Sequence, residues 1–230
     1  MNLPTQIIEP GRTTTFGFDT TTNNLLTKTI TDTASGRSRT WTYSYTTAAD
    51  STLLNLIKTI QGPRTDVSSI TSFTYLNNGD LHTITDAFGH VTTINSVDGN
   101  GRPTSITDPN GVITTLTYYP RGWLASRTVG TLSTQYTDDA VGNISKVRLA
   151  DGSYLSYTYD AAHRLTDIYD AKQDHIHYTL DNMDNRIAEN TYDANTTLSK
   201  THTRAFDKLN HLAQDINAYN ATTSYTTILT

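Results

Sequence analysis

Large apolar residues alternate with Thr, Ser or His along many short stretches of this chain. A period of two residues is typical of a strand with one apolar and one polar face. The clearest runs are Trp41, Tyr43 and Tyr45; Phe73 and Tyr75; Val112, Leu116 and Tyr118; Leu155, Tyr157 and Tyr159; and Ile176, Tyr178 and Leu180. The pattern predicts short antiparallel strands, with the apolar face against a packed layer and the other face polar.

Turn residues recur at a nearly fixed spacing, in steps of 22, 21, 20, 21 and 21 residues followed by a longer one. They are Gly79, Gly101, Gly122, Gly142, His163, Asp184 and Asn210. Four residues before them stand Tyr75, Val97, Tyr118, Asp138, Tyr159, Leu180 and Phe206, and two residues after them Leu81, Pro103, Leu124, Ile144, Leu165, Arg186 and Leu212. A second turn often follows, near Gly89, Gly111 and Gly152, so each period of about 21 residues predicts one hairpin.

Glycine at a turn allows positive φ, and Asp or Asn bonds its own backbone two residues on, so these residue types suit tight reversals. His163 and Asp184 stand where the other turns have Gly, which predicts a different turn type in those two repeats. The pattern divides the chain into divergent repeats over 1–65, a regular array over 66–217, and a Thr-rich tail over 218–230 that has no turn signal and is expected to be an incomplete repeat.

The composition supports an all-β fold. About a fifth of the residues are Thr, 14 are Tyr, and only 35% are hydrophobic. The net charge of -5 provides no general attraction for nucleic acid. The chain has no Cys and no apolar run of roughly 20 residues that would span a membrane, and we expect no signal peptide in this segment, because residues 1–18 lack the basic start and apolar run of a secretory signal.

The residues that could form ligand sites are better explained as turn and strand residues. We therefore expect no bound metal, no cofactor and no enzymatic activity. His175 and His177 lie two apart beside Asp174, but a zinc site needs a third protein ligand. The oxygen-rich segments 181–185 and 138–139 do not match a calcium loop, since Met183 stands at a ligand position. Gly99 and Gly101 lack the strand-to-helix context of a phosphate loop, and no Ser has the surroundings of a nucleophile.

Aromatic side chains offer the best-motivated alternative to a purely structural role. Trp41, Trp123 and the many tyrosines are residue types that stack on sugars, so a surface-exposed adhesion or carbohydrate-binding module stays open. Packing along the repeat is favoured, because most of these aromatic residues occupy its apolar positions.

The repeated words carry a family resemblance. They are Tyr159-Asp160-Ala161-Ala162-His163-Arg164-Leu165, Tyr192-Asp193-Ala194-Asn195, and Phe206-Asp207-Lys208-Leu209-Asn210-His211-Leu212. These resemble the YD repeat of RHS proteins, whose pattern is aromatic-Asp-x-x-Gly-x-Leu followed by a second Asp-x-x-Gly, and the match extends over roughly 66–212. The repeat positions that carry it are Tyr75, Gly79, Leu81, Gly89, Gly101, Gly111, Tyr118, Gly122, Leu124, Gly142, Tyr159, Asp160, Leu165, Phe206 and Asp207.

RHS proteins include bacterial polymorphic toxins, insecticidal toxin-complex subunits and teneurins, which build hairpin strips that spiral into a hollow shell. The resemblance implies a non-catalytic wall segment whose partners are adjacent repeats and an enclosed C-terminal toxin, in a protein that is secreted or at the cell surface. Asp108-Pro109-Asn110-Gly111 is only superficially similar to the family's self-cleavage motif, because its companion word is missing. We expect a polar face to suit such cargo, and the isolated chain, with open strand edges, to self-associate.

Overall fold

The computed structural model describes residues 3–49, 53–219 and 221–225. The chain forms two compact units, residues 1–115 and residues 116–230. Every regular element in the described residues is a β-strand, and none of these residues is in a helix that could cross a membrane. The predicted all-β fold built from antiparallel hairpins is confirmed.

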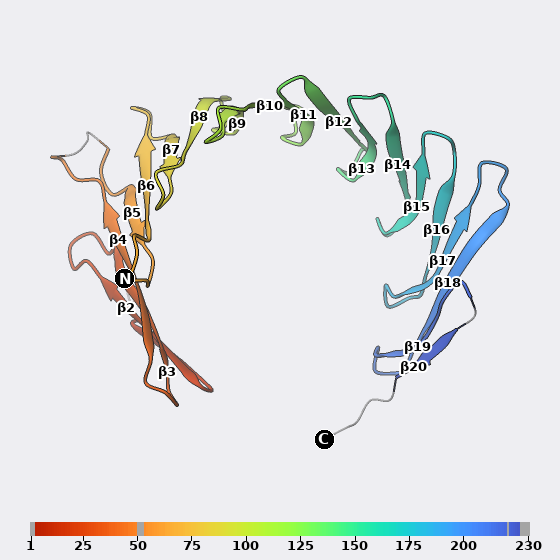
Figure 1. The fold of residues 1–230 in the computed structure, drawn as a ribbon, viewed down its shortest axis with the longest axis horizontal. Helices are drawn as coiled ribbons and strands as arrows, with labels where there is room; N and C mark the ends of the chain where they lie inside the picture. The colour runs from red at the N-terminus through yellow and green to blue at the C-terminus, as the bar shows by residue number, and fades with distance from the viewer. Residues whose placement is uncertain (1–2, 50–52, 220, 226–230) are drawn as a thin grey trace. The chain divides into compact units, whose positions relative to one another are not determined.

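In the first unit, each strand pairs antiparallel with the next one along the chain (Figure 1). Its strands are β1 (Gln6–Glu9), β2 (Arg12–Phe18), β3 (Leu25–Asp32), β4 (Ser38–Tyr45), β5 (Ile57–Gln61), β6 (Ile70–Tyr75), β7 (Leu81–Thr85), β8 (Val91–Val97), β9 (Pro103–Thr107) and the first half of β10 (Ile113–Tyr118). The hairpin pattern therefore also holds before residue 66, although the boundary at 65 stays a prediction.

The second unit has the same meander from β11 onward. Its strands are β11 (Leu124–Val129), β12 (Leu132–Asp138), β13 (Ile144–Arg148), β14 (Tyr154–Tyr159), β15 (Leu165–Asp170), β16 (His175–Leu180), β17 (Arg186–Tyr192), β18 (Leu198–Phe206), β19 (Leu212–Ile216) and β20 (Thr222–Ser224). An Asn217 to Ala221 backbone hydrogen bond of 3.1 Å closes the turn before β20. At this turn Asn217 Oδ1 accepts the amides of Tyr219 and Ala221 over 2.9 and 3.1 Å. That residues 218–230 form an incomplete repeat stays a prediction.

Two kinds of turn alternate along both units. The turns at Gly79, Gly101, Gly122, Gly142, His163, Asp184 and Asn210, which we call primary turns, connect the strand pairs from β6–β7 to β18–β19. A β-bulge lies beside the primary turns at Gly79, Gly101, Gly142, His163, Asp184 and Asn210. The secondary turns, at Gly89, Gly111, Gly130, Gly152, Gln173 and Thr196, connect one hairpin to the next.

His163 and Asp184 form the same turn as the glycines. Both have positive φ, 64° and 69°, and the amide of His163 donates to the carbonyl of Asp160 over 3.0 Å, as that of Gly79 does to Leu76 over 2.9 Å. The prediction of another turn type was therefore wrong. The left-handed conformation costs a non-Gly residue roughly 1–2 kcal/mol. The hydrogen bonds of the turn hold His163 and Asp184 in this conformation despite that cost.

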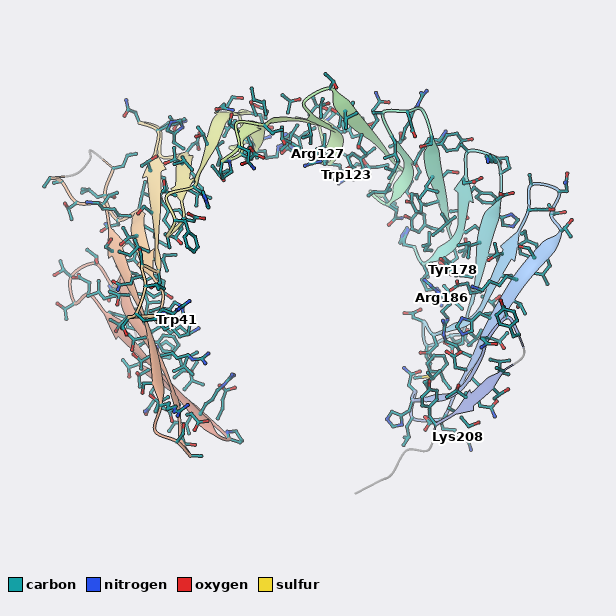
Figure 2. The ribbon with its side chains drawn as sticks, viewed as in Figure 1. Trp41, Trp123, Arg127, Tyr178, Arg186 and Lys208 are labelled. Atoms are coloured by element: carbon teal, nitrogen blue, oxygen red, sulfur yellow. The ribbon has the colours of Figure 1, made fainter. Side chains whose placement is uncertain are left out.

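Neither unit has a packed core. Among the described residues only Tyr178 and Thr14 are buried, with 7% and 6% of their surface exposed. Side chains stand on both sides of the ribbon, and no second layer of described strands covers either face within a unit (Figure 2). The packed layer that we expected against the apolar face is absent from the described part of the chain. The partial burial of these side chains comes from neighbouring side chains on the same sheet.

The polar face is held by a ladder of hydroxyl groups. Cross-strand hydroxyl oxygens lie 2.9 Å apart between Thr29 and Thr40, 2.6 Å between Thr74 and Thr83, and 3.1 Å between Thr128 and Ser133. Each such bond satisfies two side chains within the sheet itself. The ladder explains why Thr is so frequent, since a β-branched residue with a hydroxyl both favours strand geometry and bonds its cross-strand neighbour.

Candidate functional site

The repeated unit itself is the feature most relevant to function, and its apolar residues form what we call the seam. At the primary turns, and at the corresponding turns after β2 and β4, the last residue of one strand pairs with the first residue of the next strand. The pairs include Phe18 with Leu25, Tyr45 with Ile57, Tyr75 with Leu81, Tyr159 with Leu165, and Phe206 with Leu212. The bulge makes this pairing possible, because its extra residue shifts the register by one and brings Leu81 opposite Tyr75.

Seam tyrosines connect neighbouring hairpins. The hydroxyl of Tyr75 donates to the carbonyl of Ile57 over 2.7 Å, and that of Tyr159 donates to the carbonyl of Ile144 over 2.8 Å. Tyr45 makes the equivalent bond to Leu25 over 2.9 Å. Partial burial raises the pKa of all three tyrosines. Each bond runs from the end of the first strand of one hairpin back to the start of the preceding strand, so the seam couples consecutive repeats.

Aspartate side chains accept hydrogen bonds from backbone amides of the turns. Asp160 Oδ1 accepts the backbone amides of Ala162 and Arg164 over 2.9 and 3.0 Å, and Asp207 accepts those of Leu209 and His211 over 2.8 and 2.9 Å. The side chain of Arg164 also donates to Asp160, and this bond is the main cause of a lowered pKa of that carboxyl. The same amide pattern recurs at Asp86, Asp98, Asp108, Asp139, Asp170, Asp181 and Asp193.

The residues identified from the sequence as repeat positions fall into three places. Gly79, Gly89, Gly101, Gly111, Gly122 and Gly142 have positive φ at turns. Tyr75, Tyr118, Tyr159 and Phe206 end strands, whereas Leu81, Leu124 and Leu165 begin them. Asp160 and Asp207 are the turn acceptors described above. That these residues are the positions that define the repeat stays a prediction.

One recurring contact was missed by the sequence reasoning. At three turns the extra residue of the bulge carries a hydroxyl that donates to a carbonyl on the opposite strand: Ser145 to Thr137 over 3.0 Å, Thr166 to Thr158 over 3.2 Å, and Ser199 to Thr191 over 3.0 Å. The usable signal is a Ser or Thr three residues after the turn centre, at Ser145, Thr166 and Ser199.

His175 and His177 share the polar face but have separate partners. The ring of His175 stacks between those of Tyr169 and Tyr192, with centroids 4.8 and 4.7 Å apart. His177 Nδ1 lies 2.7 Å from Asp167 Oδ1 on the neighbouring strand. Within the described residues no group of three His, Cys, Asp or Glu is arranged to hold a metal ion.

The oxygen-rich segments are turns. Both carboxylate oxygens of Asp181 accept hydrogen bonds, from Met183, from the amide of Asn185 and from the side chain of Asn185. Asp139 accepts the amides of Val141, Gly142 and Asn143 in the same way. Asp138 differs, because its Oδ2 is buried without a hydrogen-bond partner.

The two tryptophans each have a cation over the ring. Lys28 Nζ lies 5.9 Å from the Trp41 ring centroid, and the Arg121 guanidinium carbon lies 5.4 Å from that of Trp123. Trp123 also packs on Gly142, where an added Cβ would lie 2.7 Å from its Cζ2 atom. Figure 2 shows a similar contact between Tyr178 and Arg186, whose guanidinium carbon lies 3.6 Å from the Tyr178 ring centroid. These contacts occupy ring surface that a stacked sugar would use.

Comparison with known proteins identifies the repeat. Residues 97–134 and 139–175 match the family model described as RHS Repeat. No curated protein matches the chain. A crystal structure of TcdB2-TccC3-TEV is similar over 89% of this chain and 11% of its own, with 16% identity and a TM-score of 0.69. A crystal structure of TcdB2-TccC3 is similar over 90% of this chain and 14% of its own, with 16% identity and a TM-score of 0.65.

A third structure, the Photorhabdus luminescens Tc holotoxin pore, is similar over 93% of this chain and 14% of its own, with 15% identity and a TM-score of 0.61. The chain thus spans about 11–14% of the length of these matched chains. At such low identity the likeness shows a shared fold, and the family-model match shows the repeat. The alternating bulged turns, the aromatic–Leu seam and these matches together show that the chain contains RHS/YD repeats.

Proposed function

We propose that this chain is a non-catalytic wall segment of a larger RHS-type shell that encloses a toxin or effector polypeptide. The main support is the absence of a core among the described residues: a sheet with two buried residues derives little stability from its own interior. Such a sheet gains stability when further repeats extend it and cover its edges. The partners would then be adjacent repeats and the enclosed C-terminal polypeptide, in a secreted or cell-surface protein.

The matched structures support the same proposal, because the sheet of this chain is similar to a part of much larger chains. The described side chains also support a structural role, because the seam, the hydroxyl ladder and the turn carboxylates all use their polar groups within the sheet.

Limited proteolysis of the intact protein that contains this chain tests the proposal. We expect one polypeptide segment outside the repeats to resist protease while the sheet is folded, and to become sensitive under conditions that unfold the sheet. Digestion of every non-repeat segment at the rate of an unfolded control would contradict an enclosing wall. Catalytic turnover lost on replacing one polar side chain of this chain would contradict its non-catalytic role.

A further inference from the structure

Position 138 breaks the rule of the seam. The equivalent residues before the other primary turns and their N-terminal counterparts are Phe18, Tyr45, Tyr75, Val97, Tyr118, Tyr159, Leu180 and Phe206, all apolar or aromatic. Asp138 occupies this place in β12 and pairs with Ile144 across the turn. A carboxylate opposite an aliphatic side chain costs free energy unless it has a partner. Departures from a local rule of this kind concentrate at functional sites.

A pocket lies where a seam aromatic residue is missing. It has a volume of about 370 Å³ and is lined by Tyr119, Pro120, Arg121, Trp123, Thr137 and Asp138. Its wall is mainly aromatic and aliphatic, with Trp123 held between Gly142 and the turn before it. The hydroxyl of Tyr119 donates to the carbonyl of Tyr136 over 2.9 Å, which fixes another side of the pocket.

The nearby polar groups have other partners, which leaves Asp138 Oδ2 without a donor. Arg121 Nη1 donates to the carbonyl of Ala140 over 2.7 Å, and its guanidinium lies over Trp123. Asp139 is bonded to three backbone amides of its own turn and adds a second negative charge. Asp138 Oδ2 is the buried side-chain oxygen of the described residues that has no hydrogen-bond partner. The pocket therefore combines an apolar wall with an acceptor that lacks a donor.

We propose that this pocket binds a primary ammonium group on an apolar stem, as a lysine side chain of a polypeptide presents it. The ammonium pairs with the Asp138 carboxylate, and a charge-assisted bond of this kind is among the stronger ones in proteins. The methylene stem packs along Tyr119, Pro120 and Trp123, as long cationic side chains do on apolar surface. The pocket belongs to this chain alone, so the inference does not depend on whether the wall encloses a polypeptide.

Fluorescence of Trp123 measures this binding directly. The chain has two tryptophans, so Trp41→Phe leaves Trp123 as the reporter. We expect a saturable change in its emission on titration with N-acetyl-lysine amide. The uncharged analogue N-acetyl-norleucine amide should bind at least about tenfold more weakly, because it lacks the donor. An equal response to both probes, or none to the lysine probe, would overturn the proposal.

Three variants complete the test, with circular dichroism as a check on folding. Asp138→Asn keeps the shape but removes the charge and should lose about tenfold in affinity. Asp138→Tyr restores the seam residue, fills the pocket, and should abolish binding while raising the melting temperature. Asp151→Asn, at a secondary turn, should bind like the parent. Unchanged affinity in folded Asp138→Asn, or an equal response to methyl glucoside, would show that the site is not an ammonium pocket.

Discussion

Single residues in the left-handed conformation decide where this chain reverses. Most are glycines, as the sequence predicts, but His163, Gln173, Asp184, Thr196 and Asn210 adopt the same φ range without being glycine. Gly142 has two requirements at once, because its φ is 103° and Trp123 lies directly over it. The contrast between Gly142 and an open turn glycine therefore separates backbone strain from side-chain contact.

Replacing Gly142 by Ala should destabilise the second unit more than the same change at Gly152. Gly152 has φ 87° and only the tip of Arg148 near its missing Cβ, so Gly152→Ala should cost the left-handed penalty of roughly 1–2 kcal/mol. Gly142→Ala adds a clash with Trp123, which should cost about 1–3 kcal/mol more. Urea unfolding followed by circular dichroism measures both, and equal losses would show that Trp123 does not pack there.

Removing one seam hydroxyl tests the link between hairpins. Tyr159→Phe should lower the free energy of unfolding by about 1 kcal/mol, because the carbonyl of Ile144 loses its donor. Tyr157→Phe is the matched control on the same strand, since no hydrogen bond of its hydroxyl is recorded within the described residues. If the two variants are equally stable in urea, the seam bond contributes nothing.

At the scale of elements, the hairpins and their turns follow from spacing, because period two and recurrent turn residues both act locally. The hydroxyl ladder and the bulge contacts of Ser145 and Thr166 do not follow from spacing, since they depend on which residues become opposite after the bulge shifts the register. The pocket beside Asp138 was missed for a related reason. Asp138 is visible as an odd residue in the seam, but its missing partner is visible only in three dimensions.

The turn carboxylates make the hairpins sensitive to acid. Hydrogen bonds hold the pKa of Asp98, Asp139, Asp160 and Asp181 below its ordinary range, chiefly through the side chains of Arg102, Asn143, Arg164 and Asn185. A lowered folded-state pKa adds stability that is complete above the unfolded value and is lost as pH falls through the folded value. Stability should therefore decline from about pH 4 downward. Asp160→Asn should reduce this decline, and an identical pH profile in that variant would contradict it.

At the scale of the whole molecule, each unit exposes large apolar side chains and unpaired strand edges. Phe88, Ile8 and Leu132 have 87%, 75% and 67% of their surface exposed. The isolated chain of 230 residues should therefore associate, with an apparent mass in light scattering that rises with concentration. A monomer that persists at high concentration would mean that the sheet needs no neighbouring repeats.

In each unit the chain forms a ladder of hairpins with a fixed register and two distinct faces. Because it has no Cys, paired cysteines test this directly. Thr74→Cys with Thr83→Cys, and Thr128→Cys with Ser133→Cys, join cross-strand partners on the hydroxyl face. Thr74→Cys with Ile84→Cys, and Thr128→Cys with Leu132→Cys, place the thiols on opposite faces. We expect rapid intramolecular disulfide formation in the first two pairs and not in the last two, and equal oxidation of all four would contradict a fixed register.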